Sequence, residues 1–137
     1  QSIIRYGLLI WGNSTRINDI LILQKKVIRI MTKANPLDHC KPLFIELELQ
    51  TVINLYIFDS VSYILKNIPA LTFGSNIHSY NTRNKNNIAI EHRRLSKTQQ
   101  SHILTSQKIY NKLRNVVDKY PTNIFKAKLH TWLLRNP

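Results

Sequence analysis

The sequence predicts an all-α fold, and three observations lead to that prediction. Glycine is scarce, with three in 137 residues. Apolar residues recur at helical spacing through most of the chain, as in amphipathic helices. An asparagine-rich stretch over residues 68–96 lacks this spacing. We therefore expect a helical bundle over residues 1–67, a long loop over 68–96, and two C-terminal helices over 97–137 that form one compact unit with 1–67.

The first expected helix covers residues 16–33. Ser14 or Thr15 is expected to cap its N-terminus, because a side-chain hydroxyl can bond a free backbone amide there. Pro36 is expected to end it, because the residue before proline is pushed out of the helical region. The helix has an apolar face and a cationic face. The apolar face holds Ile17, Ile20, Leu21, Leu23, Val27, Ile28, Ile30 and Met31, and the cationic face holds Lys25, Lys26, Arg29 and Lys33.

Two further helices are expected in the first half of the chain. Pro42 suits the first turn of a short helix over residues 42–49. Thr51 then caps a helix over residues 52–67, which is apolar around most of its circumference. Its polar arc holds Asn54, Asp59, Ser62 and Lys66. So narrow a polar arc predicts that this helix is central to the core.

The C-terminal part is expected to form helices over residues 97–120 and 123–136, with Pro121 between them and Thr122 as an N-cap. The apolar face of the first holds Ile103, Ile109, Tyr110, Leu113, Val116 and Val117, opposite Lys97, Lys108 and Lys112. The apolar stripe of the second holds Phe125, Leu129, Trp132 and Leu133. These stripes predict that both helices pack against the rest of the chain.

The charge points to a polyanionic partner. Twenty Lys and Arg against seven Asp and Glu give a net charge of +13, which favours nucleic acid over a membrane. Residues 1–66 carry eight basic and five acidic residues (+3), and residues 67–137 carry twelve and two (+10). A partner is therefore expected mainly along the second half. A basic surface that only confers solubility remains the alternative.

Other features concern the compartment. The single cysteine, Cys40, fits a reducing environment. The apolar runs are far shorter than the roughly 20 residues that span a bilayer, and no secretory signal is visible. We expect an intracellular protein of the nucleus or cytoplasm that is not secreted and has no membrane partner. Because the chain begins at Gln1 without a Met, we also expect a fragment of something longer.

The chain on its own is not expected to be an enzyme. None of its seven carboxylates are adjacent, and the closest pair, Glu46 and Glu48, point apart on a helix. Two-metal phosphoryl transfer needs carboxylates that hold ions about 4 Å apart. No pair of residues has the spacing of a zinc site. We expect no catalytic residue, no metal and no cofactor in this chain.

The residues suited to binding are cations and one aromatic ring. Lysine and arginine contact phosphates without reading sequence, and a tyrosine can stack on a base. The loop segment NIHSYNTRNK (76–85) could be a solvent-facing strip that touches nucleic acid, or a flexible polar linker; both interpretations remain open. The candidate nucleic-acid contacts are Lys25, Lys26, Arg29, Lys33, Tyr80, Arg83, Lys85, Arg93, Arg94, Lys97, Lys108 and Lys112.

Several segments resemble one family. YGLLIWGNS (6–14) followed by LQKKVIRIM (23–31) is similar to the region just after the polymerase core in reverse transcriptases of jockey-like retrotransposons, which lack long terminal repeats. The resemblance continues, in the family's order, through residues 41–67, HSYNTRNK (78–85), IYNKL (109–113) and FKAKLHTWLL (125–134). YGxxxWGNS with LQKKxIR is the more specific part.

The resemblance implies a helical thumb followed by a C-terminal extension. The aspartates that bind the two catalytic metal ions, expected to be Mg, would belong to a palm upstream of Gln1. The helix around LQKKVIRI would lie by the template–primer duplex, which gives Lys25, Lys26, Arg29 and Lys33 a backbone-holding role. The implied partners are RNA, an RNA–DNA or DNA duplex, and the upstream fingers and palm. A structural helical module, or a degenerate remnant without nucleic-acid binding, is the alternative.

Overall fold

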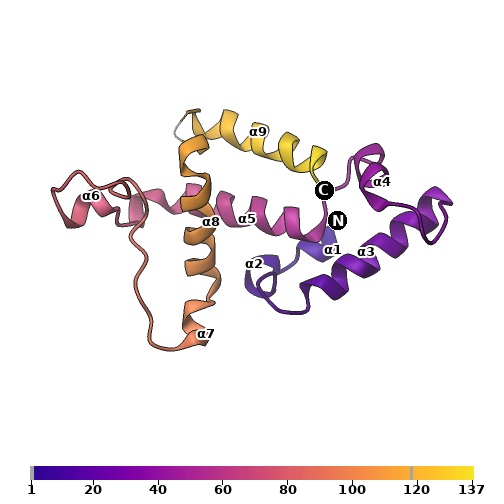
Figure 1. Ribbon diagram of the computed structural model, residues 1–137, viewed down its shortest axis with the longest axis horizontal. Coiled ribbons are helices and arrows are strands. Elements are labelled where there is room, and N and C mark those ends of the chain that lie inside the picture. The colour runs from indigo at the N-terminus through magenta and orange to yellow at the C-terminus, as the bar shows by residue number, and fades with distance from the viewer. Residues whose placement is uncertain (1, 118) are drawn as a thin grey trace. The chain divides into compact units, whose positions relative to one another are not determined.

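The computed structural model describes residues 2–117 and 119–137, without the side chains of Asn115 and Val117 (Figure 1). The expectation that Val117 lies on an apolar helix face therefore falls outside the described side chains. Within these ranges the chain forms helices and no strand, so the prediction of an all-α fold is confirmed. The helices are α1 (Ser2–Arg5), α2 (Leu8–Trp11), α3 (Ile17–Thr32), α4 (Cys40–Glu46), α5 (Val52–Asn67), α6 (Gly74–Ile77), α7 (Ser96–Gln99), α8 (His102–Val117) and α9 (Thr122–Arg135), with a 3-10 turn over Ile68–Ala70.

The chain divides into two compact units. Unit 1 consists of Gln1–Asp59 with Lys126–Pro137, and unit 2 consists of Ser60–Phe125. Helices α5 and α9 each contribute residues to both units. Each unit is described below by itself.

In unit 1, α3 packs against α4 through a small apolar core. Ile28, Cys40 and Phe44 are buried, and three half-buried leucines pack around them. The amide of Gln24 lies at the edge of this core, where its Nε2 donates to the carbonyl of Gln50 (2.8 Å) and its Oε1 accepts from the amide of Val52 (2.9 Å). Because both ends of this buried amide are bonded, Gln24 joins α3 to the start of α5 at little desolvation cost.

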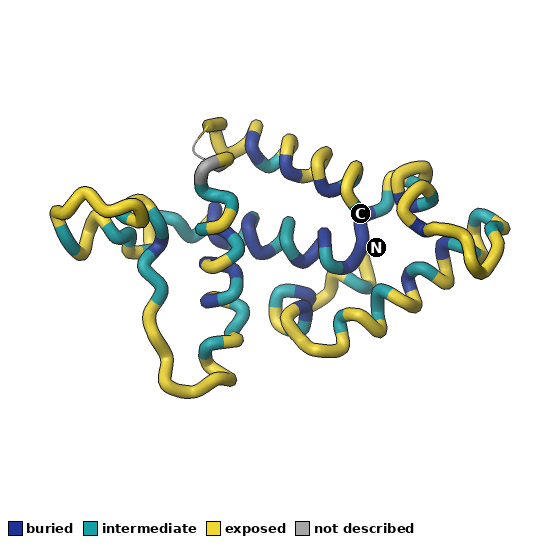
Figure 2. Tube along the Cα trace, in the orientation of Figure 1, coloured by how far each residue is buried: buried dark blue, intermediate teal, exposed yellow. Residues whose placement is uncertain are grey.

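The first half of α5 is the centre of unit 1, as Figure 2 shows by its run of buried residues. Thr51 accepts a hydrogen bond from the amide of Asn54 (3.2 Å), which confirms the predicted cap. Asn54 belongs to the polar arc of this helix and is nevertheless buried, at 7 % exposure. Its Nδ2 donates to the carbonyls of Leu133 and Asn136 at 2.8 Å each. The C-terminal carbonyls of a helix lack partners within it, so Asn54 fastens the end of α9.

The segment 2–16, for which no individual helix was predicted within the expected helical region, contains α1 and α2. The Nε1 of Trp11 donates to the carbonyl of Tyr6 (2.9 Å). Gly12 lies against the ring of Tyr56, where a Cβ would come within 2.9 Å of the ring Cγ. Arg5 makes a bidentate ion pair with Asp59, and this hydrogen bonding raises the pKa of the Arg5 guanidinium above its ordinary value.

In unit 2, the second half of α5 packs with α8. Val61, Ile64, Leu104 and Tyr110 are buried in this unit. The loop between the 3-10 turn and α7 is fastened to α8 by Asn111, whose Oδ1 accepts from the amide of Ile88 and whose Nδ2 donates to the carbonyl of the same residue, both at 2.9 Å. The side chain of Ile88 is 3 % exposed. One asparagine thus bonds both peptide groups of a loop residue.

Several predicted helix ends were wrong. Arg16 is the N-cap of α3 and no side chain bonds there, so neither Ser14 nor Thr15 caps the helix. The short helix starts at Cys40, two residues before the predicted start, and Pro42 still lies in its first turn as expected. The region 97–120 is split, since α7 ends at Gln99 and α8 begins at His102. Thr122 is the first residue of α9, where the carbonyl of Pro121 accepts from the amide of Phe125. Such shifts of one or two residues are common at helix ends, which fray.

Candidate nucleic-acid interface

The C-terminal half of α3 carries a cationic groove. Lys26, Arg29 and Lys33 line a hollow of about 450 Å³ together with Ile30, Ala34 and Pro36. Lys26 and Lys33 are exposed, and Arg29 is half-buried. The Nε and one terminal nitrogen of Arg29 donate to the carbonyl of Asp38, at 3.1 and 2.9 Å. Arg29 is thereby held in place, while the two lysines are exposed to solvent. We refer to this hollow as the α3 groove.

The end of α3 shapes the groove. Lys33 adopts the left-handed region (φ 54°), and the amide of Ala34 donates back to the carbonyl of Arg29 (3.0 Å). A left-handed residue after the last helical one is a common way to end a helix, although glycine is more usual there. The helix therefore ends at Thr32, earlier than Pro36 alone would require. A cation here also stabilises the negative end of the helix dipole.

Lys25 does not line the α3 groove. It is half-buried, and its carbonyl lies 3.9 Å from the Sγ of Cys40, beside α4. Three of the four cations predicted on this helix therefore line one hollow, and the fourth does not. Lys25 is four residues before Arg29 and so neighbours it on the helix surface.

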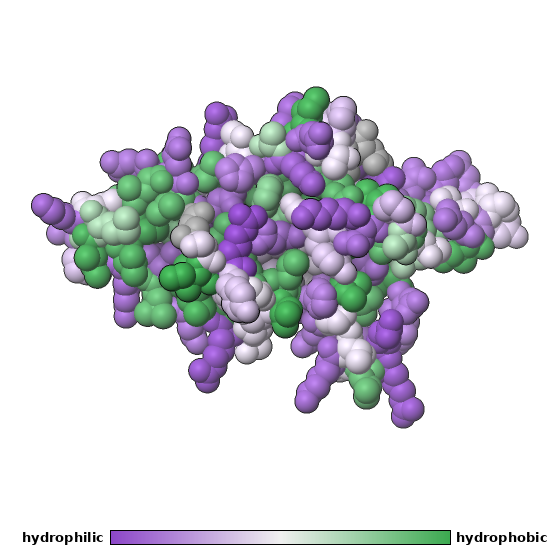
Figure 3. All heavy atoms as spheres, turned by 180° about the vertical axis from the view of Figure 1, so that it is seen from behind, coloured by the Kyte–Doolittle hydropathy of each residue, from purple (hydrophilic) through white to green (hydrophobic). Residues whose placement is uncertain are grey.

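The apolar face predicted for α3 was expected to be buried, but most of it is exposed to solvent. Leu23 is 56 % exposed, Val27 53 %, Ile30 77 % and Met31 62 %. The buried side of α3 is centred on Gln24 and Ile28, because α4 covers only that side. In Figure 3 the part that carries α3, on the left, shows green apolar side chains at the surface bordered by purple ones. These four residues form a strip that we call the α3 apolar strip.

The asparagine-rich loop has hydrogen bonding of its own. Beyond the Asn111 anchor, the amide of Gly74 donates to the carbonyl of Asn87 (3.0 Å) and that of Ala89 donates to the carbonyl of Thr72 (2.9 Å). A Cβ at Gly74 would lie 3.0 Å from the carbonyl oxygens of Asn84 and Lys85, so glycine permits this close approach. This bonding favours a defined loop conformation over a free linker.

The candidate side chains of the loop differ in exposure. Tyr80 is 75 % exposed, with its ring 6.2 Å from that of His78. Arg83 and Arg94 are exposed, whereas Lys85 is half-buried. Of these three basic side chains, those of Arg83 and Arg94 are therefore the more accessible to a ligand.

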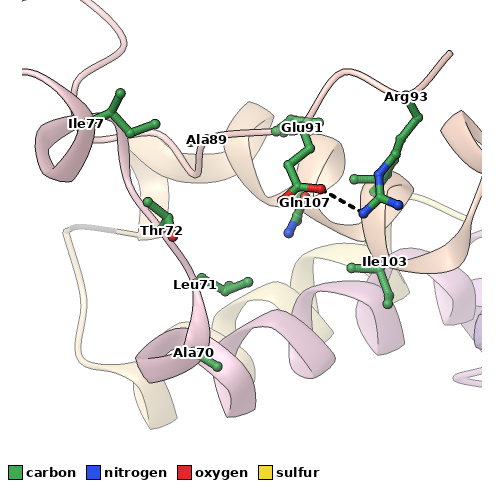
Figure 4. Close-up of a pocket in the computed structure, with 11 residues that line it drawn as sticks. Ala70, Leu71, Thr72, Ile77, Ala89, Glu91, Arg93, Ile103 and Gln107 are labelled. Carbon is green, nitrogen blue, oxygen red and sulfur yellow. Dashed lines mark hydrogen bonds and ion pairs between the residues drawn. The ribbon is translucent and has the colours of Figure 1, made fainter.

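Arg93 is paired within the protein. It donates to Glu91 at 2.7 Å, on the edge of a cavity of about 440 Å³ in unit 2. Figure 4 shows the two side chains facing each other, with Gln107 below Glu91 and Ile103 on the side of α8. Since Glu91 already neutralises its charge, Arg93 is less available to a phosphate than Arg94.

The predicted cations of α7 and α8 are exposed. Lys108 and Lys112 are four residues apart on α8 and thus lie on one face. Lys97 is on α7, which Figure 1 places well away from α6, at the other end of the loop. Within unit 2 the candidates therefore do not form a single cluster.

Sequence reasoning missed one structural residue, Asn111, and one group of surface residues on α9. Asn111, the loop anchor, gave no signal, because an asparagine in a helical pattern is usually solvated. Lys128, Trp132 and Arg135 line a hollow on α9. Their spacing, i, i+4 and i+7, could have been found by noticing a tryptophan between two cations.

Among the described residues, no three His, Cys, Asp or Glu side chains are grouped so as to hold a metal ion. In the same part of the chain, no helix is long and apolar enough to cross a membrane. Comparison with protein-family models, with curated proteins and with solved structures finds no match for this chain.

Proposed function

We propose that the chain is the thumb and C-terminal part of a retrotransposon reverse transcriptase, and that it holds the backbone of a template–primer duplex without catalysing polymerisation. The observation that carries the proposal is the α3 groove, in which Lys26, Arg29 and Lys33 line one hollow. These cations belong to LQKKVIRIM and the residues just after it, part of the segment that resembles the thumb of jockey-like elements.

The groove fits a phosphate backbone in charge and in chemistry. Two exposed lysines beside a guanidinium held by Asp38 provide several hydrogen-bond donors suited to phosphate oxygens. Binding is therefore expected to be tolerant of sequence and sensitive to salt. If about five phosphates are contacted in all, the logarithm of the affinity falls with the logarithm of salt concentration at a slope near −4.5.

The test is a titration of a labelled RNA–DNA hybrid, followed by fluorescence anisotropy at several salt concentrations. Lys26→Ala with Lys33→Ala is expected to weaken binding and to make the slope shallower by about 1.8, because two phosphate contacts are lost. The matched control is Lys41→Ala with Lys66→Ala, which removes the same charge at two exposed positions outside the groove. Equal effects of the two pairs, or a flat salt response, would contradict a backbone-holding groove.

One observation favours the structural alternative, in which the chain is a helical module that completes a larger fold. The α3 apolar strip leaves four large aliphatic side chains in water, and such patches often mark a surface that another protein segment covers. Unchanged hybrid affinity in the Lys26→Ala, Lys33→Ala variant would favour this alternative.

A further inference from the structure

The last helix carries an exposed tryptophan that its apolar pattern does not predict. Phe125, Leu129 and Leu133 of the expected stripe are buried, at 2 %, 7 % and 1 % exposure. Trp132, expected to be buried with them, is 60 % exposed, so that expectation was wrong. Its position is at the edge of the stripe, 60° from Leu129 around the helix. A tryptophan left in water is uncommon, because burying its ring is strongly favourable.

The surroundings of Trp132 are cationic. The indole lines a hollow of about 320 Å³ with Ala127, Lys128, Thr131 and Arg135. Lys128 is four residues before Trp132 and Arg135 is three residues after it, so both are its neighbours on the helix surface. No Asp or Glu occurs anywhere in α9. The small side chain of Ala127 leaves room beside the ring.

We propose that this hollow on α9 binds single-stranded nucleic acid, with a base stacked on Trp132 and the adjoining phosphates held by Lys128 and Arg135. A base presents its flat face only when it has left the duplex, so the site would favour single strands. The charge argues for nucleic acid over a protein helix, because two cations border the ring within a chain of net charge +13. This inference rests on the proposed function, to which it adds a separate site for the unpaired strand.

The experiment follows the fluorescence of Trp132 after the other tryptophan, Trp11, has been replaced. The chain has two tryptophans, so Trp11→Phe leaves Trp132 as the sole indole. Titration with a short oligo(U) is expected to quench its fluorescence to saturation, and Lys128→Ala with Arg135→Ala is expected to move the titration to higher concentration. Trp11 makes a hydrogen bond; if its replacement prevents folding, 19F NMR of the wild-type chain labelled with fluorotryptophan supplies the same readout.

Affinities measured separately on oligo(U) and on the hybrid duplex distinguish the two proposals. Trp132→Leu is expected to weaken oligo(U) binding about 5- to 150-fold with little effect on the duplex, and Trp132→Phe to restore part of it. Tyr6→Leu, at another exposed aromatic, serves as the matched control.

Unchanged oligo(U) binding in Trp132→Leu overturns this inference while the proposed function stands. A wild-type chain that binds oligo(U) but not the duplex would overturn the proposed function, and one that does not bind oligo(U) would overturn this inference. A Trp132 signal that depends on protein concentration alone would indicate a contact between copies and overturn the inference.

Discussion

At the scale of single residues, buried amides hold distant parts of each unit together. Gln24, Asn54 and Asn111 each bond two backbone groups that lie 23 to 82 residues away. The sequence did not identify them, because a polar residue on a helix reads as a solvated one unless its distant partner is known. Asn54 lies on the polar arc of its helix and is nevertheless buried. Thr51 was identified correctly, because a cap bonds a residue only three positions away.

Gly12 gives a prediction at this scale. Gly12→Ala is expected to destabilise the chain by about 1–3 kcal/mol, because the new Cβ would press on the ring of Tyr56. The backbone of Gly12 is in the right-handed helical region, which alanine adopts readily, so the cost is one of packing and not of conformation. Urea unfolding followed by circular dichroism measures it.

The control for this prediction is Ser14→Ala, at an exposed neighbouring position, where a change of no more than about 0.5 kcal/mol is expected. If Gly12→Ala were as stable as the control, the close approach of Gly12 to Tyr56 would be wrong.

At the scale of elements, the sequence predicted which segments are helical better than which faces are covered. The helix over 52–67 was placed at both ends correctly, since Thr51 caps it and its apolar residues continue to Leu65, two positions before its last residue. For α3 the pattern showed an apolar face but not how much of that face is buried. The buried part depends on α4, which has only seven residues. The cations predicted on the other face do not lie apart from it, since Ile30 of the apolar face lines the same groove as Lys26, Arg29 and Lys33. Periodicity fixes directions around one helix and carries no information about its neighbours.

The α3 apolar strip gives the prediction at this scale. Leu23→Gln with Ile30→Gln is expected to change the free energy of unfolding by no more than about 0.5 kcal/mol per site, because both side chains already face water. Ile28→Ala, one turn away on the buried side, is expected to cost about 2–5 kcal/mol.

Thermal melts of the two variants beside the wild type check this contrast. A large loss of stability in the Leu23→Gln, Ile30→Gln variant would show that the strip is covered in solution. Gel filtration of the wild type would then show whether a second copy provides the cover.

At the scale of the whole molecule, the excess of positive charge is the dominant feature. Twenty basic side chains face seven acidic ones, and pairs such as Arg5–Asp59 and Arg93–Glu91 use few of them. Composition alone predicted a polyanionic partner. It did not predict where cations gather, because grouping depends on folding: Lys26, Arg29 and Lys33 share a groove, while Lys25 does not line it. An unbalanced charge of this size destabilises a compact chain through self-repulsion.

Added salt is therefore expected to stabilise the free protein. Raising NaCl from about 0.05 M to about 0.5 M shortens the range of the repulsion to a few ångströms, and each 1 kcal/mol of relief raises Tm by about 3–6 °C for a chain of this length. The variant Lys41→Gln, Lys66→Gln, Lys119→Gln lowers the charge from +13 to +10 at exposed positions outside the proposed sites. It should melt at a higher temperature in low salt and respond less to added NaCl. A wild-type Tm that falls with salt would mean that attractive pairs outweigh the repulsion.

A short RNA should raise Tm further at low salt than NaCl does, because a ligand that binds only the folded state adds its own binding free energy to stability.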